Sequence, residues 1–274
     1  MPFRSHHRQI KVGLERFVHK ISQFIISFMA ILIFFIAQWY LSIFTQTFFL
    51  HRYAAHAMFT MSKFWERFFF IFTFISQGAN YLSAYGYGVM HRMHHAFADT
   101  DKDPHSPKYA RNIFDMMWQT YQNYNKITYK KINIEGRFTR NVPEWLTFDS
   151  VAGHYLMRLV WVVGYFFVYW FLATAWWQWL LFPITLAMAP VHGAIINWFA
   201  HKFGYREFDM TNTSTNFLPF DFLMMGESYH NNHHHHDKSA NFGIRWHEVD
   251  LTYLIILLLD KIGVIQLKPI PIKG

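Results

Sequence analysis

Three stretches of the chain contain no aspartate, glutamate, lysine or arginine, and polar segments separate them. They cover residues 21–50, 68–90 and 159–200. A helix needs about 20 apolar residues to cross a bilayer core, so the first stretch can cross once. The third is long enough to cross twice, with a tight turn near residues 174–179, where tryptophans cluster as they do at membrane interfaces. This pattern predicts a mainly α-helical integral membrane protein.

The second stretch differs from the other two, because only its first half is strongly apolar and its second half is rich in Gly, Ser, Asn and Tyr. We expect it to lie in the membrane plane or to re-enter the membrane without crossing. The first stretch is interpreted as one long helix, which gives three spans; a compressed hairpin there would give four. Pro183 and Pro190 should kink the last span.

The charge around the first stretch conflicts with a single span. Five basic residues precede it and favour a cytoplasmic N-terminus: Arg4, Arg8, Lys11, Arg16 and Lys20. A single span would put that end opposite the polar segments 96–150 and 201–250, which we expect to form a helical cytosolic cap. No internal repeat or alternating strand pattern is visible in the sequence. Residues 1–274 are therefore predicted to form one membrane-embedded domain.

Composition supports the membrane assignment and excludes other classes. Hydrophobic residues make up 53% of the chain and charged residues only 15%, whereas soluble domains carry about 25% charged residues. The net charge of +8 could indicate a nucleic-acid partner. However, the basic residues flank apolar stretches, as in membrane proteins, so we expect no nucleic acid. The absence of cysteine excludes thiolate metal sites and cysteine-bound iron–sulfur clusters.

Histidine is unusually frequent, with 18 residues, and many of them fall in spaced groups. The groups are HRYAAH at 51–56, HRMHH at 91–95, NWFAH at 197–201 and HNNHH at 230–234. An α-helix turns about 100° per residue, so the three histidines of HRMHH share a face, as do those of HNNHH. Asn197 and His201 also share a face. His51 and His56 are about 140° apart around a helix, so they could serve two different metals.

These groups lie at the ends of the uncharged stretches, where ionisable side chains are costly and usually functional. Zinc usually takes four ligands, so eight or nine imidazoles predict two metal ions. Imidazole binds Zn, Cu, Fe and Ni alike, and the residue types alone do not select the metal. The paired Glu-x-x-His motif of ferritin-like di-iron proteins is absent. Lone histidines such as His19, His154 and His192 are interpreted as structural.

The order H-x4-H, H-x2-H-H, N-x3-H and H-N-x-H-H resembles that of the membrane fatty acid desaturases. The closest likeness is to the acyl-CoA (stearoyl-CoA-type) Δ9 desaturases and their short bacterial relatives. Residues 51–106 and 197–234 carry it, and it extends to HRMHHAFADTDKDPHSP and GESYHNNHH. The resemblance implies two Fe ions held by His51, His56, His91, His94, His95, His201, His230, His233 and His234. Asn197 would act through a metal-bound water, and His235 and His236 lie outside the motif.

The resemblance also implies an activity. The protein would be an O2-dependent desaturase that places a cis double bond, at Δ9, in a saturated fatty acyl chain. The chain would be carried by CoA, with carrier protein or lipid as alternative carriers. Removal of hydrogen from an unactivated CH2–CH2 pair needs a strong oxidant, which a metal with O2 can supply and side chains cannot. The residues alone leave the carrier, the chain length and the double-bond position open.

The implied reaction consumes two electrons from outside the protein. The chain has no cysteine, no His-Pro-Gly-Gly haem signature and no Gly-x-Gly-x-x-Gly fingerprint. A separate donor of ferredoxin, rubredoxin or cytochrome b5 type is therefore expected. Basic residues between positions 92 and 131 could dock an acidic donor or the phosphates of an acyl carrier. They fit equally well the positive cytoplasmic face of a bacterial inner-membrane protein.

Two rival functions are considered. A related histidine-box hydroxylase or ketolase would use the same metals on an alkyl, sterol or carotenoid substrate and release an oxygenated product. The second rival is a non-enzymatic metal carrier or sensor in the membrane. A carrier would need polar residues through the bilayer, whereas these histidines lie at the ends of apolar stretches. The combination of NWFAH and HNNHH favours the desaturase.

Overall fold

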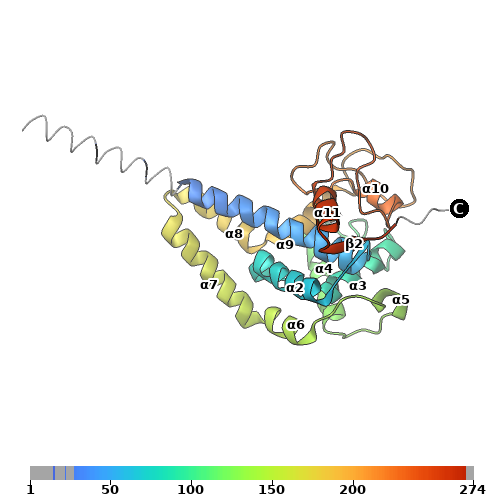
Figure 1. Cartoon of the computed structure of the whole chain (residues 1–274), viewed down its shortest axis with the longest axis horizontal. Helices are drawn as coiled ribbons and strands as arrows, with labels where there is room; N and C mark the ends of the chain where they lie inside the picture. The colour runs from blue at the N-terminus through green and yellow to red at the C-terminus, as the bar shows by residue number, and fades with distance from the viewer. Residues whose placement is uncertain (1–14, 16–21, 23–27, 270–274) are drawn as a thin grey trace, which may run out of the picture.

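The first apolar stretch forms one continuous helix, Phe28–Ala55, which runs from the far end of the helix bundle into the cap (Figure 1). The structure is a computed structural model that describes residues 15, 22 and 28–269. At about 1.5 Å per residue, a helix of this length extends for roughly 40 Å, which exceeds the thickness of a bilayer core. Its last turns, Gln46–Ala55, widen into a π-helix, η1.

The third apolar stretch forms a hairpin. Its first arm is α7, Tyr155–Leu172, and the turn follows directly. In the turn, the side-chain oxygen of Gln178 accepts hydrogen bonds from two backbone N–H groups. The chain then returns through the 3₁₀ helix η3, Trp176–Leu180, and α8, Leu181–Leu186. The turn lies where the tryptophan cluster predicted it.

The returning arm is bent by 73° between α8 and α9, Met188–Ala194, which continues into a second π-helical segment, η4, Ile195–Phe199. Pro190 explains the position of the bend. A proline ring clashes with the carbonyl four residues earlier, which here belongs to Leu186, the last residue of α8. The kink expected from the prolines is confirmed.

Two described helices, Phe28–Ala55 and α7, are long and apolar enough to cross a membrane, and the bent pair adds a third if it counts as one span. The upper count agrees with the interpretation of the first stretch as a single helix. Over the described part of the chain there is no fourth candidate. The basic residues at positions 4, 8, 11, 16 and 20 lie outside the described residues, so the side of the N-terminus stays a prediction.

The second apolar stretch forms α2, Lys63–Gln77, the 3₁₀ turn η2, Gly78–Asn80, and α3, Ala84–Phe97. The Oγ of Ser62 caps α2 by accepting a hydrogen bond from a backbone N–H in its first turn. At 15 residues, α2 is too short to cross a bilayer as helix. One face of it carries an exposed apolar stripe made of Phe64, Phe68, Ile71 and Ile75. This geometry suits a helix that lies in the membrane plane, as expected.

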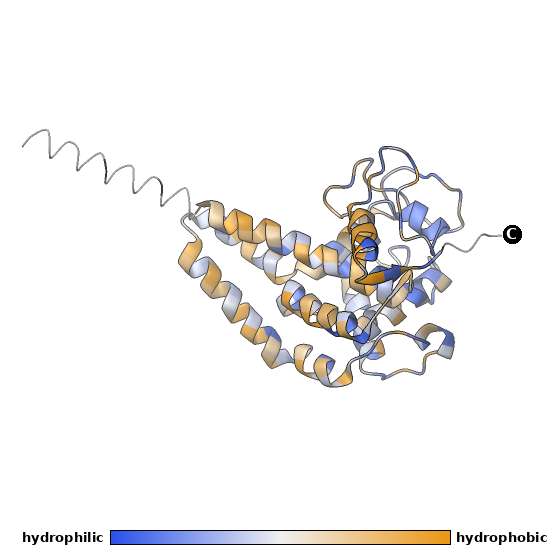
Figure 2. Ribbon diagram, viewed as in Figure 1, coloured by the Kyte–Doolittle hydropathy of each residue, from blue (hydrophilic) through white to orange (hydrophobic). Residues whose placement is uncertain are grey.

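The other elements complete the cap, where hydrophilic residues concentrate (Figure 2). They are α4, Ile113–Thr128; α5, Gly136–Thr139; α6, Leu146–Ala152; α10, His230–His235; and α11, Leu251–Lys261. Strands β1, Phe59–Met61, and β2, Ile265–Leu267, pair antiparallel and tie the C-terminal segment to the exit of the first helix. Aromatic rings, among them Phe48, Phe49 and Phe69, fill the core between the first helix and α2.

Sidedness can be tested directly, because the chain has no cysteine. Lys63→Cys, Lys102→Cys and Lys238→Cys place single thiols at exposed positions of the cap. They should react with a membrane-impermeant maleimide from the same side of sealed, oriented vesicles. Trp176→Cys, in the exposed turn of the hairpin, should react only from the other side. Labelling of positions 63 and 102 from opposite sides would show that the second stretch crosses.

Candidate metal centre

Nine histidines meet inside the cap and form two groups. Within each group, the nitrogens that could bind a metal lie within 4.8 Å of one another. Group 1 is His51, His56, His91, His95 and His233. Group 2 is His94, His201, His230 and His234. Every histidine that the sequence predicts as a ligand lies in one of these two groups.

The Nε2 atoms of each group face one another. Their separations range from 2.9 Å, for His56–His91, through 3.0 Å, for His201–His230, to 3.3 Å, for His94–His234. Two nitrogens bound to one metal at about 2.1 Å, at right angles to each other, would lie about 3.0 Å apart. The nitrogen spacing in each group therefore fits the surroundings of one metal ion.

His51 and His56 lie together in group 1, and the expectation that they could serve two different metals is wrong. The expectation assumed an ordinary α-helix. The chain instead forms the π-helix η1, and the N–H of His56 donates to the carbonyl of His51, five residues earlier, at 3.1 Å. In a π-helix five residues close about one turn, so the two imidazoles leave the helix on the same side.

Helices α3 and α10 each supply both groups. The i, i+4 pair of α3, His91 and His95, belongs to group 1, while its third histidine belongs to group 2. In α10 the i, i+4 pair, His230 and His234, belongs to group 2, and His233 belongs to group 1. The histidines of each helix share a face, as predicted, but that face is divided between the two groups. The groups must therefore lie side by side.

Three imidazoles hold their second ring nitrogen, Nδ1, against a polar side chain. His51 Nδ1 donates to the Glu227 carboxylate at 2.8 Å, and His94 Nδ1 donates to Asp103 at 2.9 Å. His201 Nδ1 lies 3.1 Å from the hydroxyl of Thr213. Such bonds fix the tautomer and the orientation of a histidine that binds metal through Nε2. The arrangement therefore leaves a free lone pair on Nε2 of each of these three histidines, and this lone pair faces the other nitrogens of its group.

Burial favours the neutral form of an imidazole, which is the form that binds metals. Burial, followed by repulsion from neighbouring histidines, holds the pKa of His91, His95 and His233 well below its usual value. Asp103 behaves in the opposite way. Burial raises its pKa, but attraction to His94 and the hydrogen bond from it outweigh burial, so the pKa lies below its usual value. Asp103 is therefore a carboxylate, able to hold the His94 proton.

A fully buried arginine supports this arrangement from behind. Arg52 donates to Asp250 at 2.6 Å and to the backbone carbonyl of Ala240 at 3.0 Å. Its guanidinium also lies 3.4 Å from Glu227, the partner of His51, and stacks over the ring of Phe242. The network links the first helix to the two loops that flank α10 and fixes the carboxylate that orients His51.

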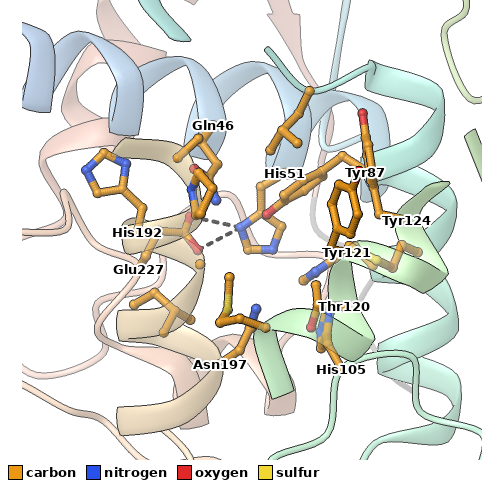
Figure 3. Close-up of a pocket in the computed structure, with 18 of the residues that line it drawn as sticks. Gln46, His51, Tyr87, His105, Thr120, Tyr121, Tyr124, His192, Asn197 and Glu227 are labelled. Atoms are coloured by element: carbon orange, nitrogen blue, oxygen red, sulfur yellow. Dashed lines mark hydrogen bonds and ion pairs between the residues drawn. The ribbon is translucent and has the colours of Figure 1, made fainter. Parts of the chain in front are cut away.

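One apolar cavity of about 390 Å³ is lined by histidines of both groups. Figure 3 shows the cavity with His51 of group 1 in its wall. Its wall includes His51 of group 1 and His230 of group 2. Asn197, which by the family resemblance would act through a metal-bound water, lines the same cavity from η4; that role stays a prediction. His105 also lines it, with its ring centroid 4.3 Å from that of His94.

The two histidines after the motif lie outside both groups. His235 stacks on the ring of Phe208 at 3.8 Å between centroids, and His236 meets the same ring edge-on at 5.1 Å. Because α10 turns about 100° per residue, the run of four histidines cannot all face the cavity. The structure brings His233 and His234 into the groups and leaves the last two residues on Phe208.

The carboxylates behind the histidines were not predicted as site residues. Glu227, Asp99 and Asp103 lie within the extended matches GESYHNNHH and ADTDKDPHSP, and Arg52 lies inside HRYAAH. Their presence within the motifs was therefore a usable signal. The partners of these carboxylates could not be predicted from the motifs. Asp99 accepts a hydrogen bond from the N–H of Thr213, and Glu227 pairs with His51, in each case across the fold.

Two metal ions per chain are expected in a fully loaded, detergent-purified sample, measured by elemental analysis. Asp103→Asn should weaken metal retention about 10- to 100-fold, because His94 loses its carboxylate partner. Competition with chelators of graded strength measures this. Asp209→Asn, an exposed carboxylate outside the groups, is the matched control and should retain metal normally. One metal per fully loaded chain would contradict the two-metal interpretation.

Removal of the buried arginine should destabilise the fold. Arg52→Leu leaves the carboxylate of Asp250 buried and unpaired, which typically costs about 3–5 kcal/mol. Denaturant unfolding in detergent should show this loss in the free energy of unfolding. Arg245→Leu, which removes an exposed guanidinium paired with Glu207 and placed over the Tyr205 ring, should leave the stability nearly unchanged. Equal effects of the two substitutions would argue against a supporting role for Arg52.

Comparison with known proteins identifies the family. The model of the fatty acid desaturase family matches residues 26–257. The chain is 27% identical to the sn-1 stearoyl-lipid 9-desaturase of Anabaena variabilis over 217 residues, which cover 78% of this chain and 74% of that protein. It is 28% identical to Delta-9 acyl-lipid desaturase 1 of Arabidopsis thaliana over 218 residues, which cover 78% and 67%.

A third relative is named for a substrate that is bound to acyl-carrier protein. The chain is 28% identical to the hex-5-enoyl-[acyl-carrier protein] acetylenase of Moorena producens over 252 residues, which cover 84% of this chain and 74% of that protein. The family match extends over most of the sequence and includes every histidine of groups 1 and 2. The chain therefore belongs to the fatty acid desaturase family.

Proposed function

We propose that this membrane desaturase introduces a cis double bond, at Δ9, into a saturated acyl chain with the help of two iron ions and O2. The family makes the chain an oxidoreductase of lipid metabolism that uses iron and O2. The double-bond position is supported by the names of relatives, which include a stearoyl-lipid 9-desaturase and a Delta-9 acyl-lipid desaturase.

The observation that carries the proposal is the cavity that meets both histidine groups. His51 and His91 of group 1 and His230 of group 2 stand in the wall of one largely apolar space. A hydrocarbon chain in this space would lie against both groups at once. Apolar walls favour such a chain and exclude water from the reacting carbons.

The residues of the two groups fit iron. All nine expected ligands are imidazoles, which iron accepts, and polar neighbours orient three of them. Group 1 would hold one ion and group 2 the other, with Asn197 near the second through water. When bound, iron with O2 supplies an oxidant strong enough to remove hydrogen from an unactivated CH2–CH2 pair. Over one cycle, two substrate hydrogens, two external electrons and two protons reduce O2 to two waters.

The carrier is proposed to be CoA and to stay outside the cavity. Three aromatic side chains of α4 line the cavity and are exposed at its mouth: Phe114, Trp118 and Tyr121. Lys108 and Arg111, also exposed, precede α4 and could meet the phosphates of CoA. The names of relatives include lipid, acyl-carrier-protein and acyl-CoA substrates. The deciding experiment therefore supplies the same acyl chain on each of the three carriers and compares the rates of desaturation.

The electrons are proposed to come from a separate donor of ferredoxin, rubredoxin or cytochrome b5 type. The absence of cysteine and of a nucleotide-binding fingerprint in the sequence supports this. The cap, which holds both groups, is the surface nearest the metals and the natural docking face. We place it on the cytoplasmic side of a bacterial inner membrane, on the basis of the basic residues that flank the apolar stretches.

Expression in a host that lacks the activity should convert saturated acyl chains into cis-monoenes, only in the presence of O2. Fatty-acid profiling by gas chromatography with mass spectrometry gives the product and the double-bond position. A hydroxy or keto product with no monoene would replace the desaturase by its oxygenase rival.

Variants of the metal groups give graded expectations in the same assay. His94→Ala should abolish the product, because a metal that loses a direct ligand is loose or absent. Asn197→Ala should reduce it less completely, since a ligand that acts through water lies further from the metal. His236→Ala, outside both groups, should be nearly neutral.

A further inference from the structure

Two histidines that line the cavity belong to neither metal group: His105, whose ring lies against that of His94, and His192. His192 lies on α9 and is completely buried, with 0% exposure. Neither of its ring nitrogens has a hydrogen-bond partner within the described part of the chain. Its ring meets the face of Trp39 edge-on at 4.5 Å between centroids, and it lines the cavity. Its ring is held in place by packing, while its polar atoms are left unsatisfied.

A second unsatisfied polar atom lines the same part of the cavity. The side-chain oxygen of Gln46, on the first helix, is buried and also lacks a partner among the described residues. Leaving such buried groups unpaired is destabilising, whereas an apolar replacement of similar shape can be neutral or stabilising. A purely hydrocarbon ligand would leave the ring nitrogens of His192 and the side-chain oxygen of Gln46 without a partner. The two residues together indicate a ligand that forms hydrogen bonds here.

The position of this polar spot indicates which part of a substrate reaches it. His192 and Gln46 lie on the opposite side of the cavity from Tyr121 and Thr120 of α4 (Figure 3). Gln46 belongs to the helix Phe28–Ala55, which is long and apolar enough to cross the membrane, and His192 belongs to the bent pair of helices. The exposed aromatic side chains stand on the α4 side. A bulky carrier stays at that exposed side, which favours a group on the acyl chain over the acyl head as the partner of His192.

We propose that His192, with Gln46, selects acyl chains that carry an oxygen substituent, a hydroxyl or a keto group. This inference rests on the proposed function and narrows its substrate class. The substituent hydrogen-bonds to His192, and Gln46 offers a second acceptor. The carbonyl of the acyl head is the other oxygen that could supply this chemistry, and the experiment separates the two sources.

The test is competitive binding to the detergent-purified, metal-loaded protein. Hexadecanoic acid and hexadecanoic acids hydroxylated at successive positions displace a fluorescent acyl probe. One narrow range of hydroxyl positions should bind about 5- to 150-fold more tightly than the unsubstituted chain, the effect of one satisfied buried hydrogen bond. His192→Phe should abolish this preference and leave the affinity for the unsubstituted chain unchanged.

The stability of the variant separates selection from a structural role. His192→Phe keeps the aromatic contact with Trp39 and removes two unpaired polar atoms, so its melting temperature should stay the same or rise. If His192 had a structural role, its replacement would lower the melting temperature. His247→Phe, a histidine outside the cavity lining, is the matched control and should keep the hydroxyl preference.

Three results would overturn the proposal. The first is equal affinity of the native protein for the unsubstituted chain and every hydroxylated chain. The second is an equal loss of affinity for all chains in His192→Phe, which would assign the hydrogen bond to the head carbonyl. The third is a lower melting temperature of His192→Phe. Failure of the proposed function is seen separately, as the absence of any monoene from plain or hydroxylated chains in the expression assay.

Discussion

The facing imidazole nitrogens are the constraint on which the rest of the structure depends. Glu227 accepts a hydrogen bond from His51, and Asp103 accepts one from His94. The hydroxyl of Thr213 lies 3.1 Å from Nδ1 of His201. The protons then sit on Nδ1, and the Nε2 lone pairs point at one another. Lone pairs gathered this closely repel unless a cation lies between them. A metal cation between the nitrogens would remove this repulsion, so we expect metal binding to contribute to the stability of the cap.

This convergence also explains the arrangement of the helices. The histidines come from the end of the first helix, from α3, from the segment after η4 and from α10. All four segments must reach one side of the membrane. A short α2 that lies in plane, and a hairpin of α7 with the bent pair, satisfy that requirement. The bend at Pro190 brings the start of η4 over the cavity, where Asn197 stands.

The sequence predicted the membrane helices, the hairpin turn and the nine histidines, because hydrophobic length and helical spacing are local properties. It failed at His51 and His56, since no local signal marks a π-helix. The carboxylates that pair with the histidines could not be predicted for another reason. Glu227 lies 176 residues from His51, and only the fold makes them neighbours. The unpaired state of His192 was equally invisible, because it depends on which side chains surround the ring.

The π-helix at Gln46–Ala55 has a consequence for how histidine motifs are counted. A wide turn behaves as an ordinary helical turn with one residue inserted. Deletion of one residue between His51 and His56 would leave a spacing of four, which an α-helix also presents on one side. The two spacings are therefore alternative solutions to the same geometry. A family can change the length of this motif without moving its metals, provided that the backbone absorbs the extra residue.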